Sequence, residues 1–88
     1  MQRITFKVGE QRYVRLLVHA TNCEVFLIRE ARWELIGSGC IESEGECLIQ
    51  DHEISAYIIP KKRVTYQLRI IYRVSDETLI AVIEVAVT

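Results

Sequence analysis

The stretch formed by residues 64–74 alternates apolar and polar side chains with a period of two. Its apolar members occupy every second position, and they are Val64, Tyr66, Leu68, Ile70, Tyr72 and Val74. Side chains spaced two residues apart point to the same side only when the backbone is extended. The pattern therefore predicts a long β-strand that buries one face and leaves the other, which includes Arg69 and Arg73, exposed.

The same alternation recurs along the chain and predicts further strands at residues 4–8, 14–20, 54–59 and 79–87. Between them, the apolar residues fall on even-numbered positions up to Ile28 and on odd-numbered positions at Ala31, Trp33 and Leu35. One extra residue near Arg29 and Glu30 must therefore be absorbed by a bulge or a break. Helix formers in residues 24–36 leave a helix as an alternative, but the β-branched and aromatic residues there favour a strand.

Turn residues divide the rest of the chain. Gly37-Ser38-Gly39 and Ser43-Glu44-Gly45 bracket a short strand at residues 40–42, and a second piece at residues 46–50 would complete a hairpin around the latter turn. Pro60 has no amide proton to donate to a sheet, so it is expected to end the strand before it. These elements amount to about seven strands with short connections.

Composition limits the classes of protein to which the chain belongs. Its 88 residues suffice for one domain, residues 1–88, and half of them are hydrophobic, which excludes a disordered chain. The formal net charge of -1 gives no electrostatic drive toward nucleic acid or anionic lipid. Without a signal region or an apolar run near the roughly 20 residues of a membrane span, we expect no membrane partner and a cytoplasmic location on synthesis.

No motif for catalysis, cofactor binding or metal binding is recognisable. Cys23, Cys40 and Cys47 are expected to be reduced packing residues, since an odd number of thiols in a reducing compartment does not predict disulfides. A zinc site from Cys40, Cys47 and His52 or His19 is the alternative, but it lacks the close Cys-x2-Cys spacing of such sites. We therefore predict a protein that is not an enzyme and has no cofactor.

Seven short antiparallel strands with this turn spacing predict an immunoglobulin-like β-sandwich. Trp33 lies in the third strand and Tyr66 near the start of the sixth, where such folds bury a tryptophan and place a tyrosine whose hydroxyl binds a nearby backbone group. Leu68 stands where antibody domains have a disulfide cysteine, which predicts aliphatic packing against Leu16 or Val18.

The wider pattern resembles the small immunoglobulin-like proteins encoded in phage and prophage structural gene clusters. Its matching residues are Ala31, Trp33, Leu35, Gly45, Glu46, Cys47, Ile58, Ile59, Pro60, Thr65, Tyr66, Leu68, Arg73, Asp76 and Glu77. The resemblance implies a virion or tail component that acts through contacts with other proteins.

The outward-facing residues of the two predicted strands at residues 64–74 and 79–87 suggest where such contacts form. Ile71, Ile80 and Val82 would share an outer face flanked by Arg69, Arg73 and Glu84. Adjacent exposed aliphatic side chains often mark protein association, although β-branched residues also simply favour strands. We predict that these six residues form a protein interface, for self-association or for a partner protein.

Two other surfaces remain as alternatives. Tyr13, Arg15, His19 and Tyr57 would share the outer face of the opposite sheet, where rings and polar groups could bind a carbohydrate or another small ligand. The basic loop Lys61-Lys62-Arg63 could contact phosphate, but three charges on a chain of balanced charge more commonly form a solvated loop.

Overall fold

The computed structural model describes residues 2–18, 27–74 and 76–88, and every regular element in these ranges is a β-strand. The strands in chain order are β1 (Gln2–Phe6), β2 (Arg12–Leu17), β3 (Ile28–Gly37), β4 (Cys40–Glu46), β5 (Leu48–Gln50), β6 (Glu53–Ile58), β7 (Thr65–Val74) and β8 (Glu77–Val87). The all-β prediction is confirmed, and the described residues form eight strands rather than about seven.

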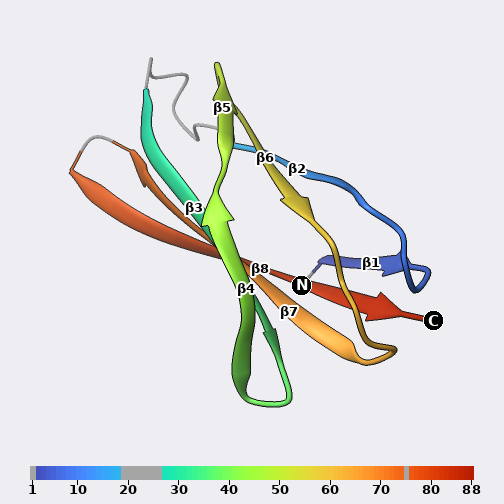
Figure 1. The fold of residues 1–88 in the computed structure, drawn as a ribbon. Coiled ribbons are helices and arrows are strands. Elements are labelled where there is room, and N and C mark those ends of the chain that lie inside the picture. Colours follow the sequence, from blue (N-terminus) through green and yellow to red (C-terminus); the bar gives the residue numbers. More distant parts are fainter. Residues whose placement is uncertain (1, 19–26, 75) are drawn as a thin grey trace.

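The strands form two sheets (Figure 1). A five-stranded sheet has the order β1-β8-β7-β3-β4, and a three-stranded sheet has the order β2-β6-β5. Neighbouring strands are antiparallel except β1, which runs parallel to β8. The expectation of a wholly antiparallel sandwich is therefore wrong for the first strand, which lies along the last strand instead of beside β2.

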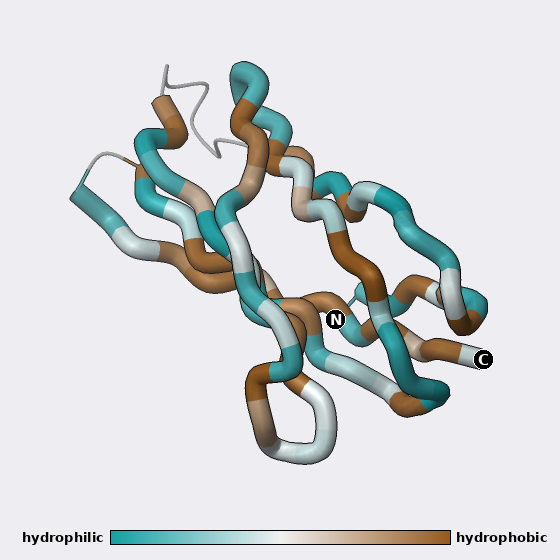
Figure 2. The backbone as a smooth tube through the Cα atoms, in the orientation of Figure 1, coloured by the Kyte–Doolittle hydropathy of each residue, from teal (hydrophilic) through white to brown (hydrophobic). Residues whose placement is uncertain are grey.

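The core consists of the apolar side chains on the inner faces of both sheets. The long alternating strand is confirmed as β7, whose Tyr66, Leu68 and Ile70 are buried. Figure 2 shows hydrophobic stretches, in brown, on strands of both sheets, with hydrophilic stretches, in teal, between them. The other large buried side chains in the strands are Phe6, Ile28, Trp33, Leu35, Ile83, Val85 and Val87 in the five-stranded sheet and Val14, Ile54 and Ile58 in the three-stranded sheet.

Two glycines make room for the two large core aromatics. Gly45 in β4 is the direct cross-strand partner of Trp33, and a Cβ there would lie 3.0 Å from the indole Nε1 atom. Gly37 at the end of β3 lies under the ring of Tyr66, where a Cβ would approach ring carbons to 2.5 and 2.7 Å. Each ring therefore packs over a bare backbone on the neighbouring strand, which a side chain at either position would obstruct.

The hairpin predicted around Ser43-Glu44-Gly45 is wrong. These residues continue β4, because Gly45 is needed under Trp33 rather than at a turn. The turn that does form is Ser38-Gly39, whose φ angles of 54° and 81° match a tight two-residue hairpin connection between β3 and β4. The predicted turn at Gly37-Ser38-Gly39 is thus confirmed.

The chain changes sheets at Cys47. Its amide donates a hydrogen bond of 3.0 Å to the Ala31 carbonyl in the five-stranded sheet, and the next residues form β5, which pairs with β6 in the other sheet. Residues 46–50 therefore do not pair back onto residues 40–42, and the predicted hairpin is replaced by a crossing between the two layers.

Strand β3 contains the bulge that the interrupted alternation of apolar residues predicts. Its pairing with β7 is irregular between Ile28 and Glu30, so Arg29 is the extra residue, as predicted. Residues 28–37 form a strand, which excludes the helical alternative there, while residues 24–26 lie outside the described residues. Downstream, β6 ends at Ile58, two residues before the buried Pro60, in agreement with the expected strand end.

Arg12 links the two sheets where β1 and β2 come closest in the chain. Its guanidinium lies 4.2 Å from the centre of the buried Phe6 ring and donates a hydrogen bond to the Thr5 carbonyl. Val8, predicted to continue the inward face of the first strand, is exposed because β1 ends at Phe6 and a turn follows. The arginine stem and head thus cover one open side of the core.

Candidate functional site

The six predicted interface residues all lie on the outer face of the five-stranded sheet. Ile71 in β7 is the direct cross-strand partner of Ile80 in β8, and Arg69 is the partner of Val82 in the next outward pair. We call Ile71, Ile80 and Val82 the outer patch. Arg73 and Glu84 extend the same face at either end, opposite Thr78 and Gln67.

Exposure within the outer patch is uneven. Ile80 is 56% exposed, whereas Ile71 and Val82 are intermediate because neighbouring side chains on the sheet cover part of them. The patch therefore presents one prominent aliphatic side chain with two partly covered neighbours. Glu84 is 3.9 Å from Arg3 on β1, so it forms an ion pair within the sheet surface.

An ion-pair group that the sequence analysis above does not predict lies on the same face. Glu34 in β3 is only 8% exposed, although it lies on the outer face. Its carboxylate oxygens lie 3.7 Å from Arg32 and 3.5 Å from Arg69. The sequence contains the signal for this group, since Arg32 and Glu34 alternate with the inward Ala31, Trp33 and Leu35 and therefore share the outer face.

A hollow of about 530 Å³ adjoins the outer patch at the end of the sheet where β3 begins and β7 ends. Ile71 and Arg73 line it together with Arg29, Arg32 and Thr78. The crossing between the sheets adds Cys47 and Ile49, and Glu30 and Glu46 complete the charged part of its wall. Three arginines thus line one cavity, which we call the arginine hollow.

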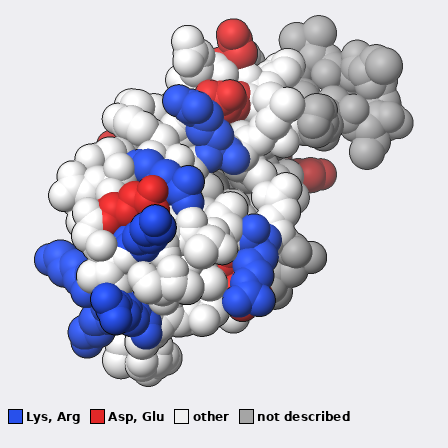
Figure 3. All heavy atoms as spheres, turned by 90° about the vertical axis from the view of Figure 1, so that its right-hand side faces the viewer, with Lys and Arg blue, Asp and Glu red and all other residues white. Residues whose placement is uncertain are grey.

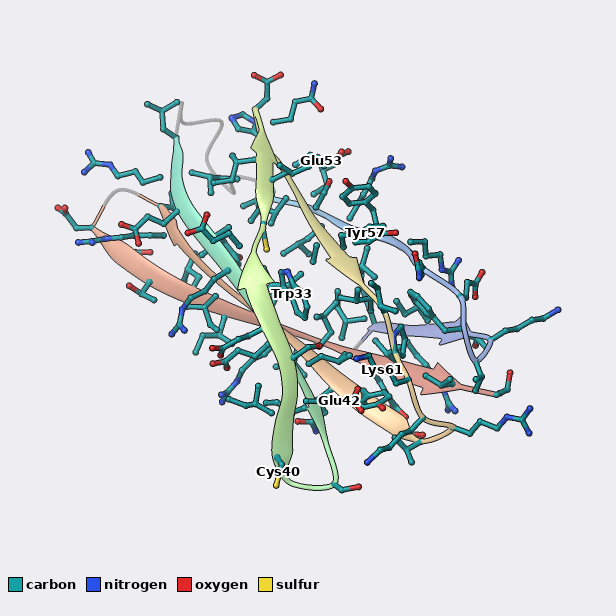
Figure 4. The ribbon with its side chains drawn as sticks, viewed as in Figure 1. Trp33, Cys40, Glu42, Glu53, Tyr57 and Lys61 are labelled. Carbon is teal, nitrogen blue, oxygen red and sulfur yellow. The ribbon has the colours of Figure 1, made fainter. Side chains whose placement is uncertain are left out.

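The opposite outer face carries the aromatic set predicted for the second sheet. Tyr13 and Tyr57 are cross-strand partners, and their ring centroids are 4.8 Å apart at an interplanar angle of 56°. Arg15 on the same face lies 3.7 Å from Glu53, and the Tyr57 hydroxyl donates to Gln11. Figure 4 labels Tyr57 and Glu53. The fourth predicted member, His19, lies outside the described residues.

A polar contact group lies near the turn between β3 and β4. The Tyr66 hydroxyl accepts a hydrogen bond of 3.2 Å from the Lys62 amide and donates one of 2.9 Å to Glu42. The backbone bond agrees with the tyrosine role expected from the resemblance, whereas the bond to Glu42 was not predicted. Burial and the adjacent Glu42 raise the pKa of Tyr66, so the hydroxyl keeps its proton.

The cysteines do not support a shared metal site. Cys40 is the first residue of β4 and Cys47 directly follows its last residue (Figure 4 labels the former), so the rise of an extended strand separates them by about 20 Å. The packing interpretation is wrong for Cys40, which is exposed, while Cys47 is partly buried and Cys23 lies outside the described residues. In the ranges that the structure describes, no group of three or more potential ligands gathers.

Basic residues collect at the end of the molecule that carries β1, the start of β2 and the loop between β6 and β7. Figure 3, which views this side, shows more lysine and arginine than acidic side chains on the visible surface. Lys61, Lys62 and Arg63 are all exposed. Among the described residues, the structure contains no helix with the length and apolarity to cross a membrane.

Comparisons with known proteins bear on the fold. No family model matches the sequence, and no curated protein matches it either. Among solved structures, the fold is similar to the crystal structure of an engineered protein, a Northeast Structural Genomics Consortium target, with a TM-score of 0.75 and 18% sequence identity. The match covers 99% of this chain but only 18% of that chain, and at this identity it concerns the fold alone.

Proposed function

We propose that this chain is an immunoglobulin-like domain that acts as a non-enzymatic assembly module, and that the outer face of its five-stranded sheet binds a second copy. The observation that carries the proposal is the pairing of the exposed Ile80 with Ile71 on an open sheet face beside Val82.

The strand order supports the immunoglobulin-like assignment. One sheet has the order β1-β8-β7-β3-β4, with β1 parallel to β8, and the other has the order β2-β6-β5. This arrangement corresponds to a Greek-key sandwich in which β7 and β8 are neighbours. The buried Trp33 and the Tyr66 hydroxyl bonded to the Lys62 amide support it further, because both are hallmarks of that sandwich.

The distribution of charge on the face supports a second copy as the occupant. Arg69 and Arg73 project from β7, whereas Glu44 and Glu46 project from β4 at the other side of the sheet. Because the face carries both signs of charge, two copies can pack face to face without placing one uniformly charged surface against another. The net charge of -1 opposes such a pair only weakly.

The size of the face is also sufficient. The molecule measures 40 × 21 × 20 Å, so its long face covers about 800 Å², close to the roughly 800 Å² per partner of a standard interface. A mixture of aliphatic and charged side chains is normal for interfaces that are not permanent, whose overall polarity resembles that of other protein surfaces.

Sedimentation velocity over a concentration series tests the proposal. The unmodified protein should form a dimer that dissociates on dilution, and Ile80→Asp should weaken it at least about tenfold by placing a charge at the centre of the contact. Leu48→Asp is the matched control, because Leu48 is 62% exposed on the outer face of the other sheet. A monomer at all concentrations, or equal weakening by both variants, would contradict self-association through this face.

The phage context implied by the sequence resemblance extends the proposal to a virion or tail component. Neighbouring genes for capsid or tail proteins would support this extension, whereas a metabolic operon would argue against it. Until then, the context and the cytoplasmic location on synthesis stay predictions.

A second candidate function rests on the paired rings of Tyr13 and Tyr57 on the opposite sheet. Exposed rings beside Arg15 offer an apolar surface with a polar group, which suits the faces and hydroxyls of sugars. Glycan-array and thermal-shift screens test this alternative, and binding that is lost in Tyr13→Ala would favour it over assembly. Blank screens across broad libraries would remove it.

A further inference from the structure

The arginine hollow is a sizeable cavity whose lining contains three arginines and two glutamates. Arg29, Arg32 and Arg73 reach it from two neighbouring strands, and its volume of about 530 Å³ exceeds that of a single bound water many times. Arg32 lies 3.7 Å from Glu34, whereas no ion pair within 4.0 Å forms between Arg29 or Arg73 and any described carboxylate. Within the part of the chain that the structure describes, Arg29 and Arg73 therefore have no ion-pair partner, and both residues are exposed.

The origin of this arrangement lies in two features of the fold. The irregular pairing at Ile28 and Glu30 makes Arg29 the extra residue at the start of β3. The crossing at Cys47 takes the chain away from β3, and among the described residues no further strand of the five-stranded sheet follows β4 at this end. A bulge often redirects a side chain for function, and here it adds a third arginine to the wall of the cavity.

We infer that the arginine hollow is a binding site for an oxyanion, a phosphate or carboxylate group held by Arg29 and Arg73 with the Thr78 hydroxyl as a further donor. Guanidinium groups present paired donors that match the spacing of oxygen atoms in such anions. This inference depends on the hollow alone and does not require that the outer face bind a second copy.

The two acidic residues of the wall set the expected affinity. Glu30 faces Arg73 across the strand pair, and Glu46 faces Arg32, so both reduce the positive potential that an anion meets. A small anion in a half-open site of this kind should bind with a Kd of about 1–10 mM, and more weakly at high salt. Removal of one of these carboxylates should strengthen binding, while removal of an arginine should weaken it.

The experiment is an NMR titration with inorganic phosphate and, separately, with a short peptide rich in aspartate. Ile80→Asn, which removes the exposed aliphatic side chain of the outer patch without adding charge beside the hollow, serves as the host protein, so that failure of self-association and failure of the anion site are distinguishable. Amides of residues 29–32 and 71–73 should shift in a saturable way. Arg73→Gln should weaken binding about tenfold, Glu46→Gln should strengthen it, and Arg63→Gln, an exposed position in the loop between β6 and β7, should leave it unchanged.

The two probes identify the source of the anion. Tighter binding of phosphate indicates a free small anion, and tighter binding of the peptide indicates an acidic segment of a partner protein. The inference is overturned if neither probe produces saturable shifts at these amides, or if Arg73→Gln and Arg63→Gln weaken binding equally, because the latter result would indicate only general attraction to a basic surface.

Discussion

At the scale of residues, Gly37 and Gly45 show how the absence of a side chain positions a large one. Each lies beneath an aromatic ring on the adjacent strand, so the sheet itself provides the surface on which Tyr66 and Trp33 pack. Close packing of this kind tolerates added volume poorly, because protein interiors are filled nearly as densely as organic crystals. The position of each ring therefore depends on a residue distant in sequence.

The two glycines should differ in their sensitivity to alanine. Gly37→Ala would place a Cβ 2.5 Å from the nearly inaccessible Tyr66 ring and should destabilise the fold by about 2–3 kcal/mol. Gly45→Ala meets Trp33 at 3.0 Å, where a small shift of the indole suffices, and should cost about 1 kcal/mol. Chemical denaturation measures both, and equal or reversed costs would contradict the packing described.

Removal of the Tyr66 hydroxyl should destabilise the protein through the groups left behind. Tyr66→Phe leaves the Glu42 carboxylate without its donor and the Lys62 amide without its acceptor, which should cost about 1–2 kcal/mol in the free energy of unfolding. Tyr57→Phe is the control, since its hydroxyl bonds to Gln11 at the exposed surface and should cost less than about 0.5 kcal/mol. Indistinguishable denaturation midpoints for the two variants would disprove the role of this contact.

The thiols should differ in reactivity. Burial raises the pKa of Cys47 from its ordinary value of 9.0 to about 11. At pH 8 this shift lowers the thiolate fraction about a hundredfold, so alkylation of Cys47 should be much slower than that of the exposed Cys40. Because the native state holds this proton more tightly, the same group should also reduce stability as the pH rises from 9 through 11. Peptide mapping by mass spectrometry after timed alkylation checks the order, and faster labelling of Cys47 would refute it.

At the scale of elements, the strands differed in how far the sequence predicted them. The parity of β7 and the bulge in β3 were predictable, because alternation and its interruption are local properties of the chain. Strand β4 was not, since Ser43-Glu44-Gly45 has the composition of a turn and only the distant Trp33 explains its glycine. The parallel pairing of β1 with β8 was equally hidden, because it joins the two ends of the chain.

Strand β1 should depend on one arginine for its attachment. Arg12→Gln removes the guanidinium from the Phe6 ring and from the Thr5 carbonyl, so amide exchange in β1 should become faster and stability should fall by about 1–2 kcal/mol. Arg15→Gln, in the same strand, loses only an exposed ion pair with Glu53 and should change little. Hydrogen exchange detected by mass spectrometry compares them, and similar exchange in both variants would mean that Arg12 does not fasten this strand.

At the scale of the whole molecule, the sequence located the candidate face but not its surroundings. Period-two parity placed Ile71, Ile80 and Val82 on one side of neighbouring strands, and the register of β7 with β8 confirms that placement. Their unequal exposure depends on neighbours across the sheet, and the arginine hollow depends on the crossing at Cys47, so neither was predictable from local pattern.

The measurement that tests the central proposal most directly is an isotope-filtered NOE experiment on a mixture of labelled and unlabelled protein at millimolar concentration. Because only contacts between copies produce signals, methyl groups of Ile80, Ile71 and Val82 should give intermolecular NOEs, and those of Leu48 on the other sheet should give none. Intermolecular NOEs confined to the three-stranded sheet, or no intermolecular NOEs at all, would contradict assembly through the outer face of the five-stranded sheet.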